Sequence, residues 1–264
     1  MYQLGTAAPE KDKMIMEPFN GVFFGCVAIF VFLLILSTIW ARRQSEATRK
    51  TVFIIICLLS FASFFVYKYF LSIDTEYDQV AYAEMGGFNW WGELPLHVCN
   101  VNMLLIPLAV LLDITPMKSF GFFVGTLGAG FAICMPAVGF SGYSILMPRM
   151  IGFYFTHFMI IVEAIALVTW GFYRPRFRDI PYALLMVIGI AAVIFVIVTL
   201  IRKTGLNPRA NYFYLMETEG ISLLNVFYQW IPLPFFYLLP AIGILSVYML
   251  AVTALFEIFG KIIK

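Results

Sequence analysis

Long apolar runs, separated by short polar segments, dominate the pattern of hydrophobic and polar positions along the chain. Each run is long enough for a helix to cross the bilayer hydrocarbon, which is about 30 Å thick and takes about 20 apolar residues. A membrane barrel would instead show alternating segments of about 10 residues. The pattern predicts an all-α polytopic membrane protein with seven transmembrane helices. The predicted spans lie near residues 21–41, 51–73, 93–112, 117–140, 150–172, 180–202 and 234–258.

Composition supports a membrane protein. Of the 264 residues, 62% are hydrophobic and 12% are charged, whereas an ordinary soluble domain has roughly 25% charged residues. A water-soluble fold is therefore excluded, and the spans leave no room for a separate soluble domain. We expect residues 1–17 to form an extracytoplasmic tail and residues 18–264 to form a single seven-helix membrane domain. The first run is too long for a cleaved signal peptide and lacks a small-residue cleavage site, so it is interpreted as a span.

The distribution of Lys and Arg between the loops indicates how the chain is oriented, because basic loops tend to stay in the cytoplasm. With the loop after the first span inside, the inner side carries ten basic residues and the outer side carries six. We therefore expect the amino terminus outside and the carboxyl terminus inside.

Charge and cysteine content exclude some classes of function. The net charge is +2, and no basic patch is interleaved with surface aromatic residues, so nucleic acid is not an expected partner. The four cysteines, Cys26, Cys57, Cys99 and Cys134, fall in apolar runs on different predicted spans without zinc-ligand spacing. We expect no metal and no cofactor. Each cysteine is by default a small buried hydrophobic residue, and no residue pattern identifies an oligomeric partner.

Polar side chains within the predicted spans mark the candidate site, because such groups are costly in a bilayer and usually functional. Both histidines of the chain, His97 and His157, lie in or at the edge of a span. The densest polar stretch opens the third span and holds Glu93, His97, Cys99, Asn100 and Asn102.

Helical spacing separates His97 from Cys99. If the third span is regular helix from Glu93, with Pro95 in its first turn, then Glu93, His97 and Asn100 share one stripe and Cys99 points away from His97. A partner for the thiol must then come from another span.

His157 in the fifth span is the expected partner. Spans three and five both begin on the outer side, which puts Cys99 about 6–9 Å and His157 about 10–12 Å below the surface. A neighbouring imidazole or a helix amino terminus can convert a thiol into the nucleophilic thiolate. The matched depths predict a Cys/His pair in the outer half of the membrane. The alternative is a structural cysteine, with His97 and Asn100 bonding across helices.

Other polar residues carry weaker signals. We expect Lys68 to extend outward to the membrane surface, with a buried counter-ion as the alternative. Glu163 is expected either to bond to another helix or to relay a proton. In the loop over residues 207–217, the tyrosines suit an interfacial anchor and Arg209 could hold a phosphate, although a plain interfacial loop fits as well. Residues 221–232 are expected to form a short surface or re-entrant helix.

Three segments carry a resemblance to a known family. They are Leu94-Pro95-Leu96-His97-Val98-Cys99-Asn100, Thr156-His157-Phe158 and Asn211-Tyr212-Phe213-Tyr214-Leu215. In this order they resemble the YwaF family of bacterial integral membrane proteins, which is related to a vertebrate transmembrane family. The vertebrate relatives are described as cysteine-dependent acyltransferases that move a fatty acyl chain from a phospholipid to a lysolipid.

The resemblance implies specific roles. Cys99 would carry the acyl thioester, His157 would act as its base, and His97 and Asn100 would shape the site or an oxyanion hole. It also implies a bacterial plasma membrane location and a membrane phospholipid or lysolipid as partner.

The leading hypothesis is therefore a membrane-embedded acyltransferase or lipid-remodelling enzyme. Its expected catalytic residues are Cys99, His157 and His97, and its expected substrate-binding residues are Asn100, Asn102, Glu93, Asn211, Tyr212, Arg209 and Glu163. One alternative is a transporter or receptor-like protein with a polar cavity for a small ligand between spans three and five. Another is a membrane scaffold that binds a protein partner.

Overall fold

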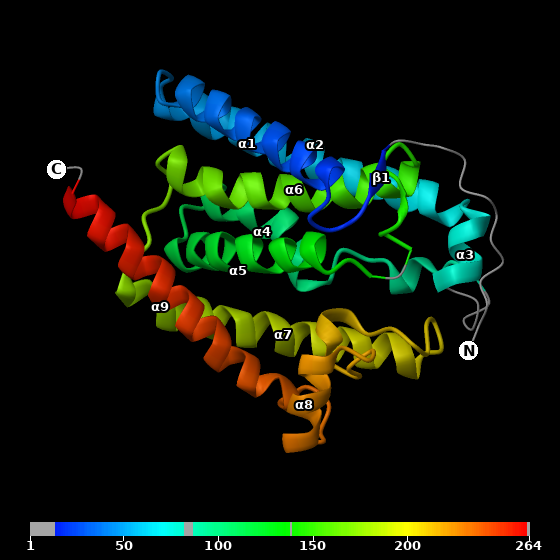
Figure 1. Cartoon of the computed structure of the whole chain (residues 1–264). Helices are drawn as coiled ribbons and strands as arrows, with labels where there is room; N and C mark the ends of the chain where they lie inside the picture. The colour runs from blue at the N-terminus through cyan, green and yellow to red at the C-terminus, as the bar shows by residue number, and fades with distance from the viewer. Residues whose placement is uncertain (1–13, 82–86, 138, 263–264) are drawn as a thin grey trace.

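The computed structural model describes residues 14–81, 87–137 and 139–262, so most of the predicted tail lies outside the described residues. The described part of the chain is almost entirely helical (Figure 1). Its α-helices are α1 (Gly21–Ala41), α2 (Glu46–Ser72), α3 (Thr75–Ala81), α4 (Val98–Leu111), α5 (Thr115–Cys134), α6 (Pro148–Thr169), α7 (Ile180–Lys203), α8 (Ser222–Trp230) and α9 (Leu239–Ile262). Short elements between them are β1 (Ile15–Met16), β2 (Tyr143–Ser144), η1 (Trp90–Gly92), η2 (Phe177–Asp179), η3 (Tyr212–Tyr214) and η4 (Phe236–Leu238).

The predicted all-α polytopic membrane class is confirmed. Six helical segments of the described chain are long and apolar enough to cross a bilayer, and they include α1, α2, α5, α6, α7 and α9. The seventh predicted span corresponds to α4, an apolar helix of 14 residues. At 1.5 Å per residue α4 is about 21 Å long, which is less than the hydrocarbon thickness. The number of spans and the orientation of the chain stay predictions.

The start of the third predicted span differs from the prediction. α4 begins at Val98 with His97 as its N-cap residue, so the stretch 93–97 is not α-helical and Pro95 does not lie in the first turn. Proline disfavours the helical conformation of the residue before it, here Leu94. The N–H of Leu94 instead donates to the hydroxyl of Tyr212, 2.8 Å away. A distant loop therefore satisfies the backbone that a longer helix would have used.

Local sequence signals set several helix ends. The side chains of Asn20 and Ser45 cap the starts of α1 and α2 by accepting backbone N–H groups. Pro148 occupies the first position of α6, where its missing N–H costs nothing. α6 stops where Gly171 takes a φ of 86°, a left-handed conformation that favours glycine.

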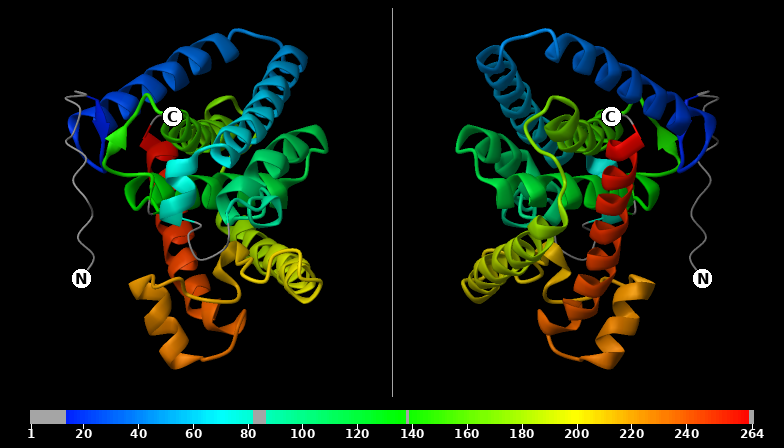
Figure 2. Two further views of the ribbon diagram at one scale, coloured as in Figure 1. Left: turned by 90° about the vertical axis from the view of Figure 1, so that its right-hand side faces the viewer. Right: turned by 90° about the vertical axis from the view of Figure 1, so that its left-hand side faces the viewer.

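The helices form three groups. α4, α5 and α6 pack against one another in the centre, with α1 and α2 on one side and α7, α8 and α9 on the other (Figure 2). α2 contacts both α4 and α6, whereas α7 contacts the centre mainly through α5. The two-residue strands β1 and β2 pair antiparallel and tie the segment before α1 to the loop between α5 and α6.

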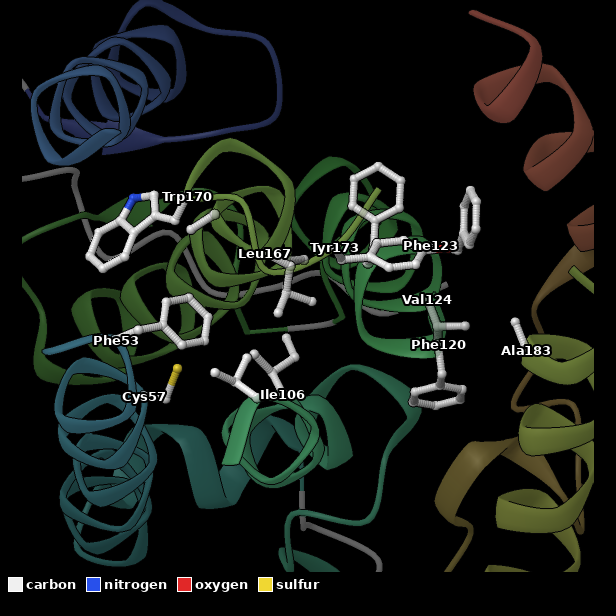
Figure 3. Packing of buried hydrophobic residues seen from close by; sticks show 14 of the residues in the cluster. Phe53, Cys57, Ile106, Phe120, Phe123, Val124, Leu167, Trp170, Tyr173 and Ala183 are labelled. Carbon is white, nitrogen blue, oxygen red and sulfur yellow. The ribbon is translucent and has the colours of Figure 1, made fainter. Parts of the chain in front are cut away.

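Apolar side chains fill the centre and also cover the outside. Phe53 of α2, Ile106 of α4, Leu167 of α6 and the C-cap residue of α6, Trp170, belong to one buried cluster (Figure 3). On α1 most of the large apolar side chains are exposed, among them Phe24, Ile29, Phe32 and Leu36. An apolar exterior of this extent suits contact with lipid and is not found on soluble monomers.

A buried arginine braces one end of the bundle. The side chain of Arg149, at the start of α6, is 1% exposed and forms ion pairs with Asp74 at 3.0 Å and Glu76 at 3.1 Å. Its guanidinium also lies 4.2 Å from the ring centroid of Tyr143 in β2. A buried charge requires such partners, so Arg149 joins the start of α6 to the α2–α3 junction and β2.

Candidate functional site

The structure brings Cys99 and His157 together although they are 58 positions apart in the sequence. The Sγ of Cys99 lies 3.6 Å from Nε2 of His157, and both residues are buried. Cys99 is the second residue of α4, and His157 lies in the first half of α6. The proximity expected from their matched depths is therefore present.

The other ring nitrogen of His157 determines how the pair can work. Nδ1 lies 2.7 Å from the carbonyl oxygen of Phe153. Because a carbonyl can only accept, Nδ1 carries the hydrogen, and the Nε2 of a neutral imidazole then presents its lone pair to the thiol. The ring centroid of Phe153 lies 4.4 Å from that of His157 and packs against it. The imidazole is thus oriented to accept a proton from Cys99.

The first turn of α4 surrounds the sulfur with polar groups. The backbone N–H groups of Cys99 and Asn100 interact with Sγ, and these N–H groups have no partner within the helix. The side-chain Oδ1 of Asn100 lies 3.7 Å from Sγ. A helix amino terminus carries partial positive charge, so the turn can stabilise an anion that forms on or beside the sulfur.

His97 faces a different set of neighbours. Its side chain is partly buried, and its ring centroid lies 5.2 Å from that of Tyr212 and 6.0 Å from that of Tyr214. Within the described part of the chain, the imidazole in contact with the thiol is that of His157. His97 therefore links the start of α4 to the loop before α8.

Lys68 and Glu93 add a buried ion pair to the site. The prediction that Lys68 extends outward is wrong, because its side chain is buried in α2 with Nζ 2.5 Å from Oε2 of Glu93. The ammonium also lies 4.7 Å from the ring centroid of Tyr67. It interacts electrostatically with His97, Cys99 and His157. The carboxylate of Glu93 offsets part of the cost of burying the Lys68 ammonium, so the side chain does not extend to the membrane surface.

The sequence analysis gave a buried counter-ion only as the alternative for Lys68, and it did not name Glu93 as the partner. The available signal was a lysine and a glutamate of opposite charge in neighbouring predicted spans, which often pair inside membranes. Their separation of 25 positions did not indicate that they meet.

Tyr212 ties the loop before α8 to the segment before α4. Its hydroxyl donates to the carbonyl of Trp91 at 2.9 Å and accepts from the N–H of Leu94 at 2.8 Å. The residue is 1% exposed, so its expected role as an interfacial anchor is wrong. Burial raises the pKa of the Tyr212 hydroxyl, which keeps it protonated as a donor. Tyr212 thus positions the segment that leads into Cys99.

The other predicted residues of this loop have separate surroundings. The amide of Asn211 donates to the carbonyl of Glu217 and to Oε1 of Glu219, each at 2.8 Å, and accepts from Met216. Asn211 therefore organises its own loop, and a role in substrate binding stays a prediction. Arg209 is exposed, and its expected contact with a phosphate also stays a prediction.

Asn102 and Glu163 lie in two different helix interfaces. Asn102 is fully buried, donates to the carbonyl of Val98 at 2.8 Å, and faces α5, where a Cβ added at Gly125 would lie 3.7 Å from its Cγ. Glu163 is also buried, and its polar neighbours are Cys57 and Ser60 of α2. Glu163 is about 9 Å further along α6 than His157. The structure therefore separates Glu163 from the thiol.

The described residues contain no group of three or more His, Cys, Asp or Glu side chains placed to hold a metal ion. The chemistry that the arrangement offers is that of a thiol, an imidazole and a helix amino terminus in a buried setting. Together they can form a thiolate and stabilise an adjacent negative charge.

Comparison with known proteins identifies the family. Neither the curated proteins nor the solved structures contain a match to the chain. The family model described as the TMEM164 family matches residues 17–253, a range that includes Cys99, His157 and the loop before α8. The related membrane family expected from the sequence fits this match, whereas the narrower YwaF designation is not confirmed. Because the match covers most of the membrane domain, the chain belongs to the TMEM164 family.

Proposed function

We propose that this protein is a membrane-embedded lipid acyltransferase in which Cys99 carries the acyl chain as a thioester. The observation that carries the proposal is the contact between Sγ of Cys99 and Nε2 of His157, at 3.6 Å. The hydrogen bond from Nδ1 of His157 to Phe153 leaves Nε2 as the acceptor in that contact. A thiol with an oriented base is the arrangement that nucleophilic catalysis requires.

The first half-reaction transfers the acyl group to the protein. His157 takes the proton of the thiol, and the thiolate adds to the ester carbonyl of a phospholipid. When the tetrahedral intermediate collapses, the bond to the glycerol oxygen breaks, and that oxygen receives the proton from His157 and leaves as a lysolipid hydroxyl. The acyl chain remains bound to Cys99 as a thioester.

The second half-reaction reverses these roles with a new acceptor. The hydroxyl of an incoming lysolipid gives its proton to His157 and adds to the thioester carbonyl. Collapse breaks the carbon–sulfur bond, and the proton returns from His157 to the sulfur. A phospholipid with an exchanged acyl chain is released, and the protein returns to its starting state without a cofactor.

The location of the pair suits lipid substrates. α4 and α6 lie within an apolar helical bundle whose exterior suits lipid contact, so an ester carbonyl near the bilayer interface could approach without leaving the membrane. With the predicted orientation, the substrate would come from the outer leaflet of a bacterial plasma membrane. His97 and Asn100, beside Cys99, would then shape the site for the ester.

The test is acyl transfer in a defined bilayer. The purified protein is placed in nanodiscs with a phospholipid that carries an isotope-labelled acyl chain and with an unlabelled lysolipid, and exchange is followed by mass spectrometry. We expect Cys99→Ala to abolish transfer, because no thioester can form. The matched control is Cys134→Ala, which removes a partly buried thiol elsewhere in the bundle and should retain transfer.

A trapped intermediate gives a second readout. The wild-type protein incubated with the labelled phospholipid alone should carry a hydroxylamine-labile acyl group on the peptide that contains Cys99. Full transfer by Cys99→Ala would refute the proposal. Binding or uptake of a small solute with no acyl exchange in any variant would favour the transporter alternative.

A further inference from the structure

Two consecutive aromatic residues in η3 have an unusual backbone. Phe213 has a φ of 59° and Tyr214 a φ of 56°, both in the left-handed region. Residues with bulky side chains rarely adopt this conformation because Cβ approaches the carbonyl oxygen. Such strained residues persist only where surrounding structure holds them, and they concentrate at functional sites.

The segment that leads into α9 holds this turn in place. Tyr237 of η4 is fully buried, and its hydroxyl donates to the carbonyl of Tyr214 and also to that of Glu217, which lies 3.1 Å away. The N–H of Phe235 donates to the carbonyl of Leu215 at 2.7 Å. These bonds fix both sides of the strained turn.

This conformation places the ring of Tyr214 against His97, two residues before Cys99 in the sequence. The ring centroid of Tyr214 lies 6.0 Å from that of His97, and its hydroxyl interacts electrostatically with Cys99. In the described part of the chain this hydroxyl makes no hydrogen bond, whereas the hydroxyl of Tyr212 is fully engaged by Trp91 and Leu94. Tyr214 therefore keeps a donor available near His97, the residue that caps the helix carrying Cys99.

The surroundings of Tyr214 keep its hydroxyl protonated. Burial raises the pKa of this phenol to about 12, and the acidic groups of Glu219 and Cys99 add to the rise. At neutral pH the residue is therefore a hydrogen-bond donor and adds no negative charge to the site.

We propose that Tyr214 is a catalytic residue, whose hydroxyl donates a hydrogen bond to the carbonyl oxygen that becomes negative when Cys99 attacks an ester. This inference rests on the proposed function. As the sulfur–carbon bond forms, the electron pair of the carbonyl moves to its oxygen, and the phenol and the N–H groups of the first turn of α4 stabilise that charge. Donors that are already oriented at such an oxygen need no rearrangement during the reaction.

The experiment separates carbonyl chemistry from thiol reactivity. Tyr214→Phe keeps the ring against His97 and removes only the hydroxyl. We expect kcat for acyl transfer to fall roughly 10²–10³-fold, the usual effect of losing one oxyanion donor, with KM little changed. Alkylation of Cys99 by iodoacetamide displaces iodide at a methylene carbon and creates no oxyanion, so its rate should match the wild type.

Two further variants serve as controls for Tyr214→Phe. His157→Gln removes the base and should slow both acyl transfer and alkylation. Tyr212→Phe removes the other hydroxyl of the same turn, which supports the segment before Cys99, and should lower the thermal stability that Tyr214→Phe preserves.

Each result decides the inference. If Tyr214→Phe transfers acyl chains within twofold of the wild type while Cys99→Ala is inactive, the role of Tyr214 is refuted and the proposed function stands. Equal losses of transfer and alkylation in Tyr214→Phe also refute it, because they indicate that the hydroxyl only positions the thiol. A wild-type protein without transfer activity would refute both proposals.

Discussion

The polar groups around Cys99 and those between α2 and α6 differ in how they are partnered. Around Cys99, Lys68 pairs with Glu93, and Nδ1 of the neutral His157 imidazole donates to the carbonyl of Phe153. Between α2 and α6, the carboxyl oxygens of Glu163 lie near Cys57 and Ser60, but neither they nor the hydroxyls of Ser60 and Thr156 meet a partner at ordinary hydrogen-bond geometry in the described residues. We call this second region, made of Ser60, Thr156 and Glu163, the α2–α6 seam.

The two regions differ in whether their buried polar groups have hydrogen-bond or ion-pair partners. A buried polar atom without a partner costs free energy, whereas a paired one becomes costly only when its partner is removed. Thr156 and His157 are neighbours in sequence, whereas Thr156 and Glu163 are seven positions apart and therefore lie on one face of α6. One helix therefore presents the site on one face and the seam on another.

The largest expected effect on acyl transfer comes from replacing His157, and its neighbour Thr156 provides the matched control. His157→Gln removes the base that accepts the thiol proton, and we expect acyl transfer to fall roughly 10²–10⁴-fold. Thr156→Val, of similar shape, should leave transfer close to wild type. The measurement is the nanodisc exchange assay. Equal losses in both variants would mean that the two faces of α6 do not differ as described.

Removal of one partner from the ion pair should be the largest effect on stability. Lys68→Met removes the ammonium that lies against the half-buried carboxylate of Glu93, and we expect a loss of about 3 kcal/mol. Lys68→Met combined with Glu93→Leu should recover most of that loss, because neither charge remains. Thermal unfolding of the detergent-solubilised protein measures both. A double variant less stable than Lys68→Met would contradict the pairing argument.

A smaller loss is expected where Tyr212 ties the loop before α8 to the segment before α4. Tyr212→Phe leaves the N–H of Leu94 and the carbonyl of Trp91 without their partner, which should cost about 1–3 kcal/mol. Hydrogen exchange at Leu94 should rise in the same variant. Unchanged protection there would show that Tyr212 does not hold the segment before α4.

The smallest effect is expected in the α2–α6 seam. Glu163→Met replaces unpartnered oxygens with an apolar side chain, and we expect the unfolding free energy to stay within about 1 kcal/mol of the wild type or to rise. Acyl transfer should be retained. A loss comparable with that of Lys68→Met would show that Glu163 has a partner that stabilises the fold, and would remove the contrast between the two regions.

Much of the architecture followed from the sequence because its cause is local. Runs of apolar residues predict helices in a bilayer wherever they occur, and most predicted spans match helices within a few residues. The proximity of Cys99 and His157 was also predictable, because fixed helical rise converts sequence position into depth.

Features that depend on distant partners were not predictable. The start of α4 is set partly by Tyr212, which is 118 positions from Leu94. Lys68 is buried because Glu93 lies beside it, and no property of Lys68 alone reveals this. The left-handed turn at Phe213 and Tyr214 opposes local preference and exists because Tyr237 holds it. Each of these features depends on a contact between segments that meet only in the folded protein.

The brace supplied by Tyr237 has a consequence for biogenesis. Helices enter the membrane in the order of synthesis, and Tyr237 precedes the last helix, α9. A chain made only as far as α8 contains Cys99, His157 and the strained turn, yet it lacks the residue that holds that turn. The turn that carries Tyr214 is therefore held in place only after the segment immediately before α9 has been made.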